Sequence, residues 1–346
     1  MIDLRSDTVT KPTPEMLQAM VHAKVGDDVF QEDPTVIAFE NKMAMLFGME
    51  AGLFVPSGTM SNQLGLTILA GPGEEVLIDE LGHVYNYETG AAAHLSSLQL
   101  RPLKGQRGIL SPEVVEAAVR AKNDWDPWTT VLALENTTNK GGGACYTRTQ
   151  LLELRELSQK KGLSLHLDGA RIWNAISATG IEPQFFGSVA DTLSVCFSKG
   201  LGAPVGSMLL TTRDGIRKAR RFRKMWGGGM RQVGLLAAAA DYAVEHHWPL
   251  LKEDHHRAQK FAKHLSTKKE ILLDPDTVET NILIFEVNRD GGTGTSKTVD
   301  QVLRSYKEYG IEMVGFGGNT IRATFHFQID DAMLDQLIQV TDIIFT

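Results

Sequence analysis

Short apolar runs alternate with helical patterns from about residue 35 to 240, and this alternation limits the chain to few folds. The runs are GLFVPS, EEVLIDE, SLQLRPL, TTVLALEN, LSLHLDGA, TLSVCFSKG and GSMLLTT. Strands separated by helices imply crossover connections, which are typical of parallel sheets. We therefore predict an α/β fold whose large domain holds a mostly parallel seven-stranded sheet sandwiched by helices.

The pattern changes beyond about residue 245. A charged helix, KEDHHRAQKFAKHL, precedes the apolar runs ILIFEV, IEMVGF and TIRATFHF and two further helical patterns. Since one core seldom grows past ~250–300 residues, a chain of this length favours two domains. We predict a large domain at 1–244 and a small C-terminal α+β domain at 245–346. The chain should open with an irregular arm, because the prolines of TKPTPE delay the first helix to about Glu15.

Composition excludes several classes of partner. The net charge of −7 offers no basic field for nucleic acid or an anionic membrane. Apolar stretches such as LLAAAADYAV fall short of the ~20 residues of a membrane span, and MIDLRSDTVTKP has no signal-peptide pattern. With two cysteines in the chain, no disulfide scaffold is indicated. A cytoplasmic location is expected.

Lys199 and Asp168 each follow an apolar run, in VCFSKGLG and LSLHLDGAR. In parallel sheets ligands collect at the carboxyl ends of strands, so the two side chains should meet there. A lysine at the mouth of a core is typical of amines that form Schiff bases. Together they match the needs of pyridoxal phosphate, which takes one amine at its aldehyde carbon and one carboxylate at its ring nitrogen.

A phosphate seat is predicted in VPSGTMSNQLGLTILAGP, which reads as a strand end, a turn and a helix. Gly58 lets the backbone approach, Thr59 offers a hydroxyl, and the first amides of the helix favour an anion. The alternative is a capped helix start that binds nothing. In KMWGGGMRQ, Lys224 and Arg231 form a cationic turn that either closes on a phosphate, from this subunit or a neighbour, or is a flexible loop.

Other polar residues are candidates for the same site. His83 follows a strand and could stack on a flat ring and exchange protons, unless it is merely structural. If the stretch after it is helical, Tyr87, four residues on, lies beside it. Arg171 could reach a ring hydroxyl or a substrate carboxylate through a bidentate pair, with a surface arginine as the alternative. Arg322 lies in an apolar strand, where a substrate carboxylate or an internal salt bridge would compensate its charge.

Two patterns are dismissed. GGTGTSKT resembles a phosphate loop, but Ser296 stands where the motif requires a glycine before Lys297. The histidine doublets at 246–247 and 255–256 point in divergent directions on helices, so they predict solvated surface and no metal site.

Several motifs in order resemble the low-specificity L-threonine aldolases, which have the aspartate-aminotransferase fold (fold type I) of pyridoxal-phosphate enzymes. They are LRSDTVTKPT, DDVFQEDPTV, PSGTMSN, HVYNYE, LHLDGARIWNA, SKGLGAPVGS and KMWGGGMRQ. The resemblance implies that the cofactor is held by Lys199 through its aldehyde, Asp168 at the pyridine nitrogen, His83 over the ring, Gly58 and Thr59 at the phosphate, and Arg231 of a neighbouring subunit. It implies that Ser6, Arg171 and Arg322 receive the substrate carboxylate, with Tyr87 and Lys224 nearby. It further implies a homotetramer with active sites at a subunit interface.

The implied reaction splits L-threonine, L-allo-threonine or a related 3-hydroxy amino acid into glycine and an aldehyde. His83, or a bound water, would assist the proton transfers. A β-eliminating lyase or racemase of the same fold would use the same lysine and aspartate and is the main alternative. An aminotransferase and a non-catalytic cofactor-binding homologue are weaker ones.

The chain departs from the family pattern at two places. Trp125 and Thr138 stand where many members have histidine. Either His83 and water suffice for proton transfer, or the pocket is built around an indole for another β-substituent. The preference for threonine or allo-threonine therefore stays open.

Overall fold

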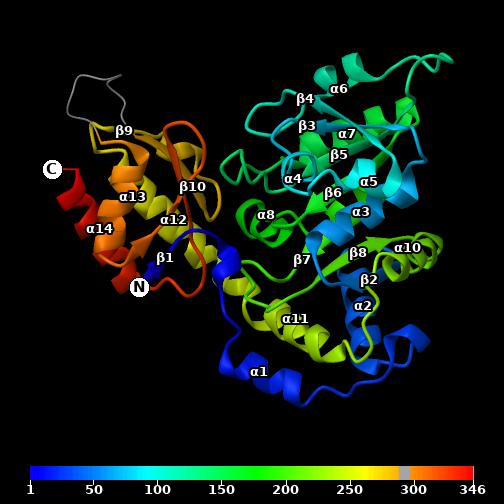
Figure 1. Ribbon diagram of the computed structural model, residues 1–346, viewed down its shortest axis with the longest axis horizontal. Coiled ribbons are helices and arrows are strands. Elements are labelled where there is room, and N and C mark those ends of the chain that lie inside the picture. The colour runs from blue at the N-terminus through cyan, green and yellow to red at the C-terminus, as the bar shows by residue number, and fades with distance from the viewer. Residues whose placement is uncertain (288–296, 346) are drawn as a thin grey trace.

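The computed structural model describes residues 1–287 and 297–345 (Figure 1). The segment GGTGTSKT, dismissed above as a phosphate loop, lies mostly outside this part of the chain. A seven-stranded sheet forms the centre of the larger portion, in the order β2-β8-β7-β6-β5-β3-β4. Its strands are β2 (Ala51–Val55), β3 (Glu75–Asp79), β4 (Gln99–Leu103), β5 (Thr129–Glu135), β6 (Ser164–Gly169), β7 (Thr192–Cys196) and β8 (Ser207–Thr211).

Most of this sheet is parallel. β8 runs antiparallel to both of its neighbours, and the pairings β3·β4, β3·β5, β5·β6 and β6·β7 are parallel. β3, β7 and β8 are buried along their whole length, as expected for strands covered on both faces. The predicted α/β fold and its seven strands are confirmed.

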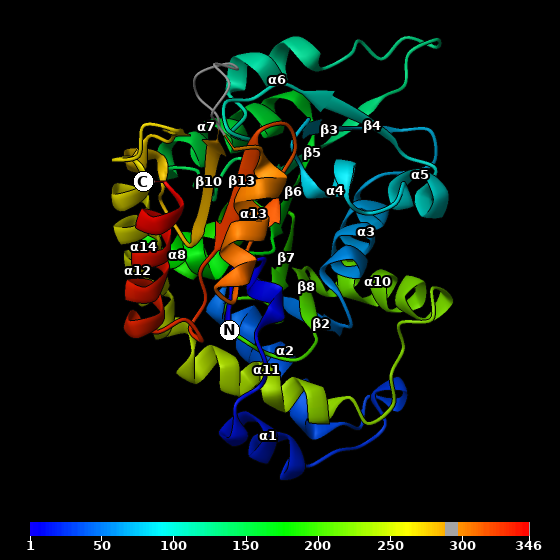
Figure 2. The same cartoon turned by 60° about the vertical axis from the view of Figure 1, so that its left-hand side comes forward.

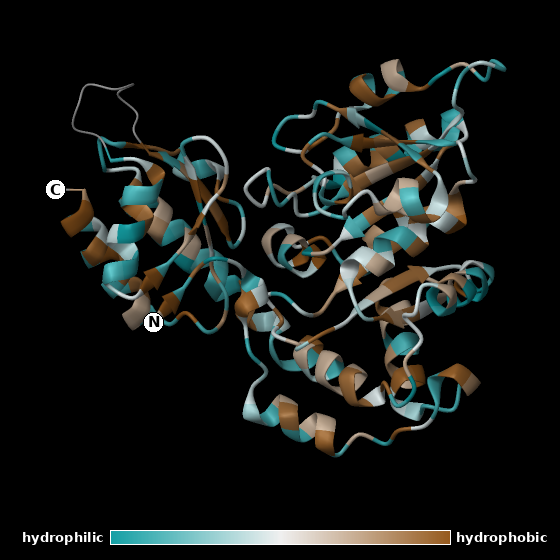
Figure 3. Ribbon diagram, viewed as in Figure 1, coloured by the Kyte–Doolittle hydropathy of each residue, from teal (hydrophilic) through white to brown (hydrophobic). Residues whose placement is uncertain are grey.

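Helices cover both faces of the large sheet (Figures 1 and 2). One face packs against α3 (Gly58–Leu69), α5 (Ala91–Ser96) and α10 (Arg213–Met225). The other packs against α2 (Pro34–Leu46), α6 (Pro112–Ala118), α7 (Arg148–Lys161), α8 (Ile172–Thr179), α9 (Pro183–Val189) and α11 (Gly234–His246). Alternate residues of β2 divide between the faces: Leu53 and Val55 contact the first set, and Phe54 the second. Figure 3 shows the hydrophobic residues concentrated in the strands.

A smaller sheet lies toward the C-terminus, in the order β12-β13-β10-β9, and all of its pairings are antiparallel. Its strands are β9 (Ile271–Leu272), β10 (Ile282–Val287), β12 (Val314–Gly315) and β13 (Thr320–Thr324). The helices packed with it are α12 (Leu251–Leu265), α13 (Val299–Glu308) and α14 (Asp331–Ile344). The predicted small α+β portion is therefore present, while the boundary at residue 244/245 stays a prediction.

The N-terminal arm joins the two portions. β1 (Ile2–Asp3) pairs with β11 (Ile311–Glu312), and Ile2 and Leu4 belong to the smaller core. After a 3-10 turn at Asp7–Val9, α1 (Pro14–Val21) begins with Thr13 as its N-cap and proline at its first position. The helix expected near Glu15 is thus confirmed, and the arm leads from the small sheet past the large one.

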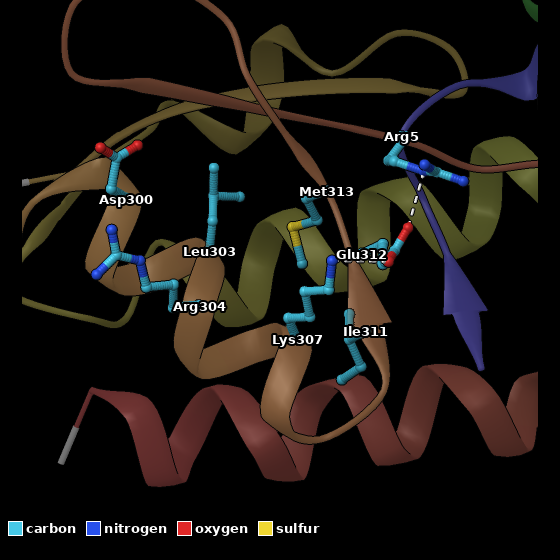
Figure 4. Close-up of a pocket in the computed structure, with 8 residues that line it drawn as sticks. All are labelled: Arg5, Asp300, Leu303, Arg304, Lys307, Ile311, Glu312 and Met313. Carbon is cyan, nitrogen blue, oxygen red and sulfur yellow. Dashed lines mark ion pairs between the residues drawn. The ribbon is translucent and has the colours of Figure 1, made fainter.

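A cavity of about 440 Å³ lies between α13 and β11 (Figure 4). Arg5 faces Glu312 across it, with Nε 3.0 Å from Oε2. None of the residues predicted for the active site is among those that line this cavity.

Candidate active site

Lys199 lies three residues past the end of β7, at the carboxyl edge of the large sheet. Its carbonyl accepts hydrogen bonds from Gly202 N (2.8 Å) and from Thr10 Oγ1 (3.0 Å), so the turn that carries it is tied to the N-terminal arm. The half-buried amine lies 3.9 Å from the thiol sulfur of Cys196. Lys199 is therefore held at the mouth of the core, as predicted.

Asp168 stands on the neighbouring strand. β6 pairs with β7 so that Asp168 is opposite Ser194, close to the end where β7 leads to Lys199. The carboxylate is buried and accepts hydrogen bonds from Asn62 Nδ2 (2.8 Å, to Oδ2) and Ala170 N (3.0 Å, to Oδ1). This register places Asp168 and the turn that carries Lys199 at the same edge of the sheet, while their joint role stays a prediction.

His83 opens the short helix α4 (His83–Asn86), four residues past the end of β3. Its Nδ1 lies 2.9 Å from Oε1 of the buried Glu88. Burial lowers the pKa of His83, but the hydrogen bond to Glu88 and the negative charges of Asp168 and Glu88 outweigh it, so the net shift is upward. Because Glu88 accepts from a protonated Nδ1, Nε2 is the ring atom left to take a proton in the neutral imidazole.

A polar network that the sequence reasoning missed lies behind these residues. Asn62, on α3, donates both to Glu88 Oε1 and to Asp168 Oδ2, each at 2.8 Å. Gln63 Nε2 donates to the other oxygen of Glu88 at 2.6 Å. Asn62 Oδ1 lies 3.2 Å from Nε2 of His166, whose pKa burial lowers to about 4. The sequence signal that could have indicated this network is the group of polar residues in GTMSNQ, within an otherwise apolar helix.

Arg171 binds a carboxylate through two hydrogen bonds, but the carboxylate belongs to Asp7. Nε and Nη2 of Arg171 lie 2.8 and 2.7 Å from the two oxygens of Asp7, and both side chains are buried. Burial pushes the pKa of Asp7 up, but the charge and hydrogen bonds of Arg171 outweigh it and hold that pKa at about 2. The surface alternative for Arg171 is wrong, and Nη1 is the nitrogen that Asp7 does not engage.

Arg322 is half-buried and bonded to neutral acceptors. Its Nη1 donates to Asn139 Oδ1 and its Nη2 to the carbonyl of Arg5, each at 2.9 Å. Its guanidinium stacks on the ring of Phe316. Burial and the charge of Arg171 lower the pKa of Arg322 to about 10. In the described part of the chain no carboxylate lies within ion-pair distance of Arg322, so the internal salt bridge considered above is not formed.

The predicted phosphate seat is the start of α3. Ser57 caps the helix by accepting from Met60 N, which leaves the amides of Gly58 and Thr59 without an intrahelical acceptor. A Cβ at Gly58 would lie 2.7 Å from Cys196 Sγ, so a side chain at this position would force the helix or Cys196 to shift. Thr59 lines a cavity of about 660 Å³ together with Ser57, Leu95, Met225, Trp226 and Gly227.

The remaining predicted residues are less closely gathered. The ring of Tyr87 is exposed and lies beside His83, with ring centroids 5.6 Å apart. Ser6 accepts from Thr8 N and Thr8 Oγ1. Arg231 is exposed and pairs with Asp27 at 2.9 Å, and Lys224 is exposed near the end of α10. The roles given to these four residues stay predictions.

Comparisons with known proteins identify relatives of this chain. A family model described as beta-eliminating lyase matches residues 3–288. A low-specificity L-threonine aldolase of Arabidopsis thaliana is 38% identical over 95% of this chain and 92% of its own length. That of Escherichia coli K12 is 43% identical over 84% and 86%, respectively. The chain belongs to the low-specificity L-threonine aldolase family.

The fold of the family is also found among solved structures. A threonine aldolase of Leishmania major matches over the whole of both chains with a TM-score of 0.84 at 17% identity. The predicted family and fold type are thus confirmed. Within the described residues, we find no helix of the length and apolar character that a bilayer crossing needs.

The two departures from the aldolase pattern occupy different environments. Trp125 is 82% exposed, in the stretch between α6 and β5. Thr138 is buried, and its hydroxyl donates to the carbonyl of Arg107 at 2.8 Å. The side chain at 138 is therefore committed to the neighbouring turn, while that at 125 is free to meet another molecule.

Proposed function

We propose that this protein uses pyridoxal 5'-phosphate to cleave the Cα–Cβ bond of L-threonine, L-allo-threonine and related 3-hydroxy amino acids. The products are glycine and an aldehyde. The observation that carries the proposal is the convergence of Lys199, Asp168 and His83 at one edge of the sheet, in a chain of the aldolase family.

The residues present fit this cofactor. Lys199 would bind the aldehyde carbon, and the buried Asp168 would keep the ring nitrogen protonated. The amides of Gly58 and Thr59, with no side chain at Gly58, would bind the phosphate. His83 would cover the ring. When bound, the cofactor accepts the electron pair that bond cleavage leaves on Cα.

The protein's own groups would orient the substrate and move its protons. No described carboxylate lies within ion-pair distance of Arg322, and Arg171 has one nitrogen not engaged by Asp7, so both can receive the substrate carboxylate, with Ser6 beside them. Nε2 of His83, directly or through a water, would take the β-hydroxyl proton as the bond breaks.

A homotetramer in the cytoplasm, with active sites shared between subunits, is part of the proposal. The exposed Leu95 and Met225 line the cavity at the phosphate seat, where a second subunit would cover them. Arg231 and Lys224, both exposed, would then reach the phosphate or the substrate of a neighbour.

Product analysis tests this function. The cofactor-loaded protein is incubated with L-threonine, L-allo-threonine and L-phenylserine, with Lys199→Ala as the inactive control. Equal amounts of glycine and aldehyde are expected. Ammonia with a keto acid would instead show β-elimination, and a change of configuration without cleavage would show racemisation; either result would overturn the proposal.

A further inference from the structure

Glu135 is the last residue of β5, at the edge of the sheet where the site lies. Its register partner in β6 is Asp168, so the two carboxylates project from neighbouring strands on the same face. Glu135 belongs to none of the predicted site residues, and the proposed reaction does not use it.

The two carboxylate oxygens of Glu135 hold two separate loops. Oε2 accepts from His83 N at 2.6 Å, and Oε1 accepts from Asn139 N at 2.8 Å. Gly82, which caps α4, has no side chain to accept from the first turn, so the acceptor comes from β5. Both partners are donors, and an ionised carboxylate accepts from each of them through a separate oxygen.

Asn139 continues this connection to the smaller sheet. Its side-chain oxygen accepts from Arg322 Nη1 at 2.9 Å, and Arg322 stands on β13. A path of three hydrogen bonds, none longer than 2.9 Å, therefore joins the backbone of His83 to the guanidinium of Arg322 through Glu135 and Asn139.

Ionising Glu135 costs free energy at this position in the fold. Burial and the charge of Asp168 raise the pKa of Glu135 to about 7, against the effect of the two N–H groups. A glutamine would avoid that cost but would lose one of the two hydrogen bonds, so the net effect of Glu135→Gln on the stability of the fold should be small.

We propose that Glu135 is a positioning residue that fixes His83 and Arg322 relative to one another, through the backbone of His83 and through Asn139. The imidazole that covers the cofactor and the guanidinium that binds the substrate carboxylate are thereby held at fixed positions relative to each other. This inference rests on the proposed function for the roles of His83 and Arg322, and it adds a residue that touches neither cofactor nor substrate.

The test is a double-mutant cycle on the cofactor-loaded enzyme. Glu135→Gln should lower kcat/KM for L-threonine about 10- to 100-fold, the size expected for losing a charged hydrogen-bond acceptor. Asn139→Ala removes the acceptor of Arg322 Nη1 but keeps the backbone N–H that Glu135 binds. If Glu135 acts through Asn139, the loss in the double variant should be at least about fivefold smaller than the product of the single losses. Losses that simply multiply would overturn the proposal.

A matched control separates positioning from stability. Glu75 is a buried carboxylate at the opposite end of the same sheet, bound by Arg120, Gln99 and Thr129. Glu75→Gln should lower the melting temperature and leave KM unchanged, whereas Glu135→Gln should raise KM with little loss of melting temperature. A lower melting temperature with an unchanged KM in Glu135→Gln would mean that Glu135 has a purely structural role.

Cofactor affinity makes the test independent of the aldolase reaction. The dissociation constant of pyridoxal phosphate, measured by absorbance titration, should rise in Glu135→Gln and in His83→Ala, which removes the ring that would cover the cofactor, and less than multiplicatively in the double variant. If the wild type cleaves no 3-hydroxy amino acid, the proposed function fails, but this second cycle still decides the role of Glu135. An unchanged affinity in Glu135→Gln would overturn it.

Discussion

Replacing Asp7 by asparagine tests how the buried Asp7–Arg171 pair supports the site. The pKa of Asp7 falls from 3.8 to about 2, which corresponds to about 2 kcal/mol of stabilisation of the ionised form. Asparagine removes that charge and leaves Arg171, 5% exposed, without a compensating carboxylate. Breaking a buried pair in this way costs about 3–5 kcal/mol, so the free energy of unfolding should fall by that amount.

The assay is urea unfolding of the cofactor-free protein at one fixed concentration, followed by tryptophan fluorescence. Asp214→Asn is the matched control, because Asp214 forms exposed ion pairs with Arg217 and Lys218 on α10 and should leave stability unchanged. In enzyme assays KM should rise in Asp7→Asn, since Arg171 loses the negative charge beside it and one of the two acceptor oxygens that orient it. Equal effects of Asp7→Asn and Asp214→Asn on unfolding would refute the reasoning.

Three further predictions follow from the same geometry. First, Glu88→Gln should lower the pKa of His83, because the carboxylate that favours its protonated form is removed; an NMR titration of the imidazole measures this, and an unchanged pKa would contradict the assigned pair. Second, Gly58→Ala should weaken pyridoxal phosphate binding about 5- to 100-fold, because the new methyl group meets Cys196 Sγ at 2.7 Å, and absorbance titration would detect it; Gly180→Ala, at an open helix end, is the control for affinity. Third, the stabilisation from Asp7 should be fully present above pH 3.8 and lost as the pH falls toward 2, because its folded pKa is depressed; the acid dependence of unfolding should therefore be weaker in Asp7→Asn than in the wild type.

Much of the fold could be predicted because the relevant signals are local. The seven apolar runs became the seven strands, and the prolines near residue 14 marked the first helix. Lys199 and Asp168 could be placed at one edge because each directly follows a strand-like run, and parallel strands bring such positions together.

The partners of the site residues could not be predicted in the same way. Asp7 lies 164 positions from Arg171, and Asn62 lies 106 from Asp168, so neither contact has a local signature. Arg171 could be identified as a carboxylate-binding residue, but whether that carboxylate belongs to the protein or to a substrate depends on tertiary packing.

The environment of Thr138 could not be predicted from its place in the family pattern either. By that pattern it replaces a histidine near the substrate, but its hydroxyl donates to the carbonyl of Arg107, 31 positions away. The side chain of Arg107 in turn binds Glu279 of the smaller portion. Family position alone therefore does not show which side chains face the substrate.

In the proposed reaction, the amine of Lys199 binds the cofactor aldehyde beside Asp168. Borohydride reduction of the cofactor-loaded protein, followed by peptide mass spectrometry, identifies the lysine that carries this linkage, because reduction makes it permanent. We predict a pyridoxyl group on the peptide that contains Lys199 and on no other lysine. A label on a different lysine, or a loaded protein that acquires no label, would show that Lys199 is not the cofactor-binding amine.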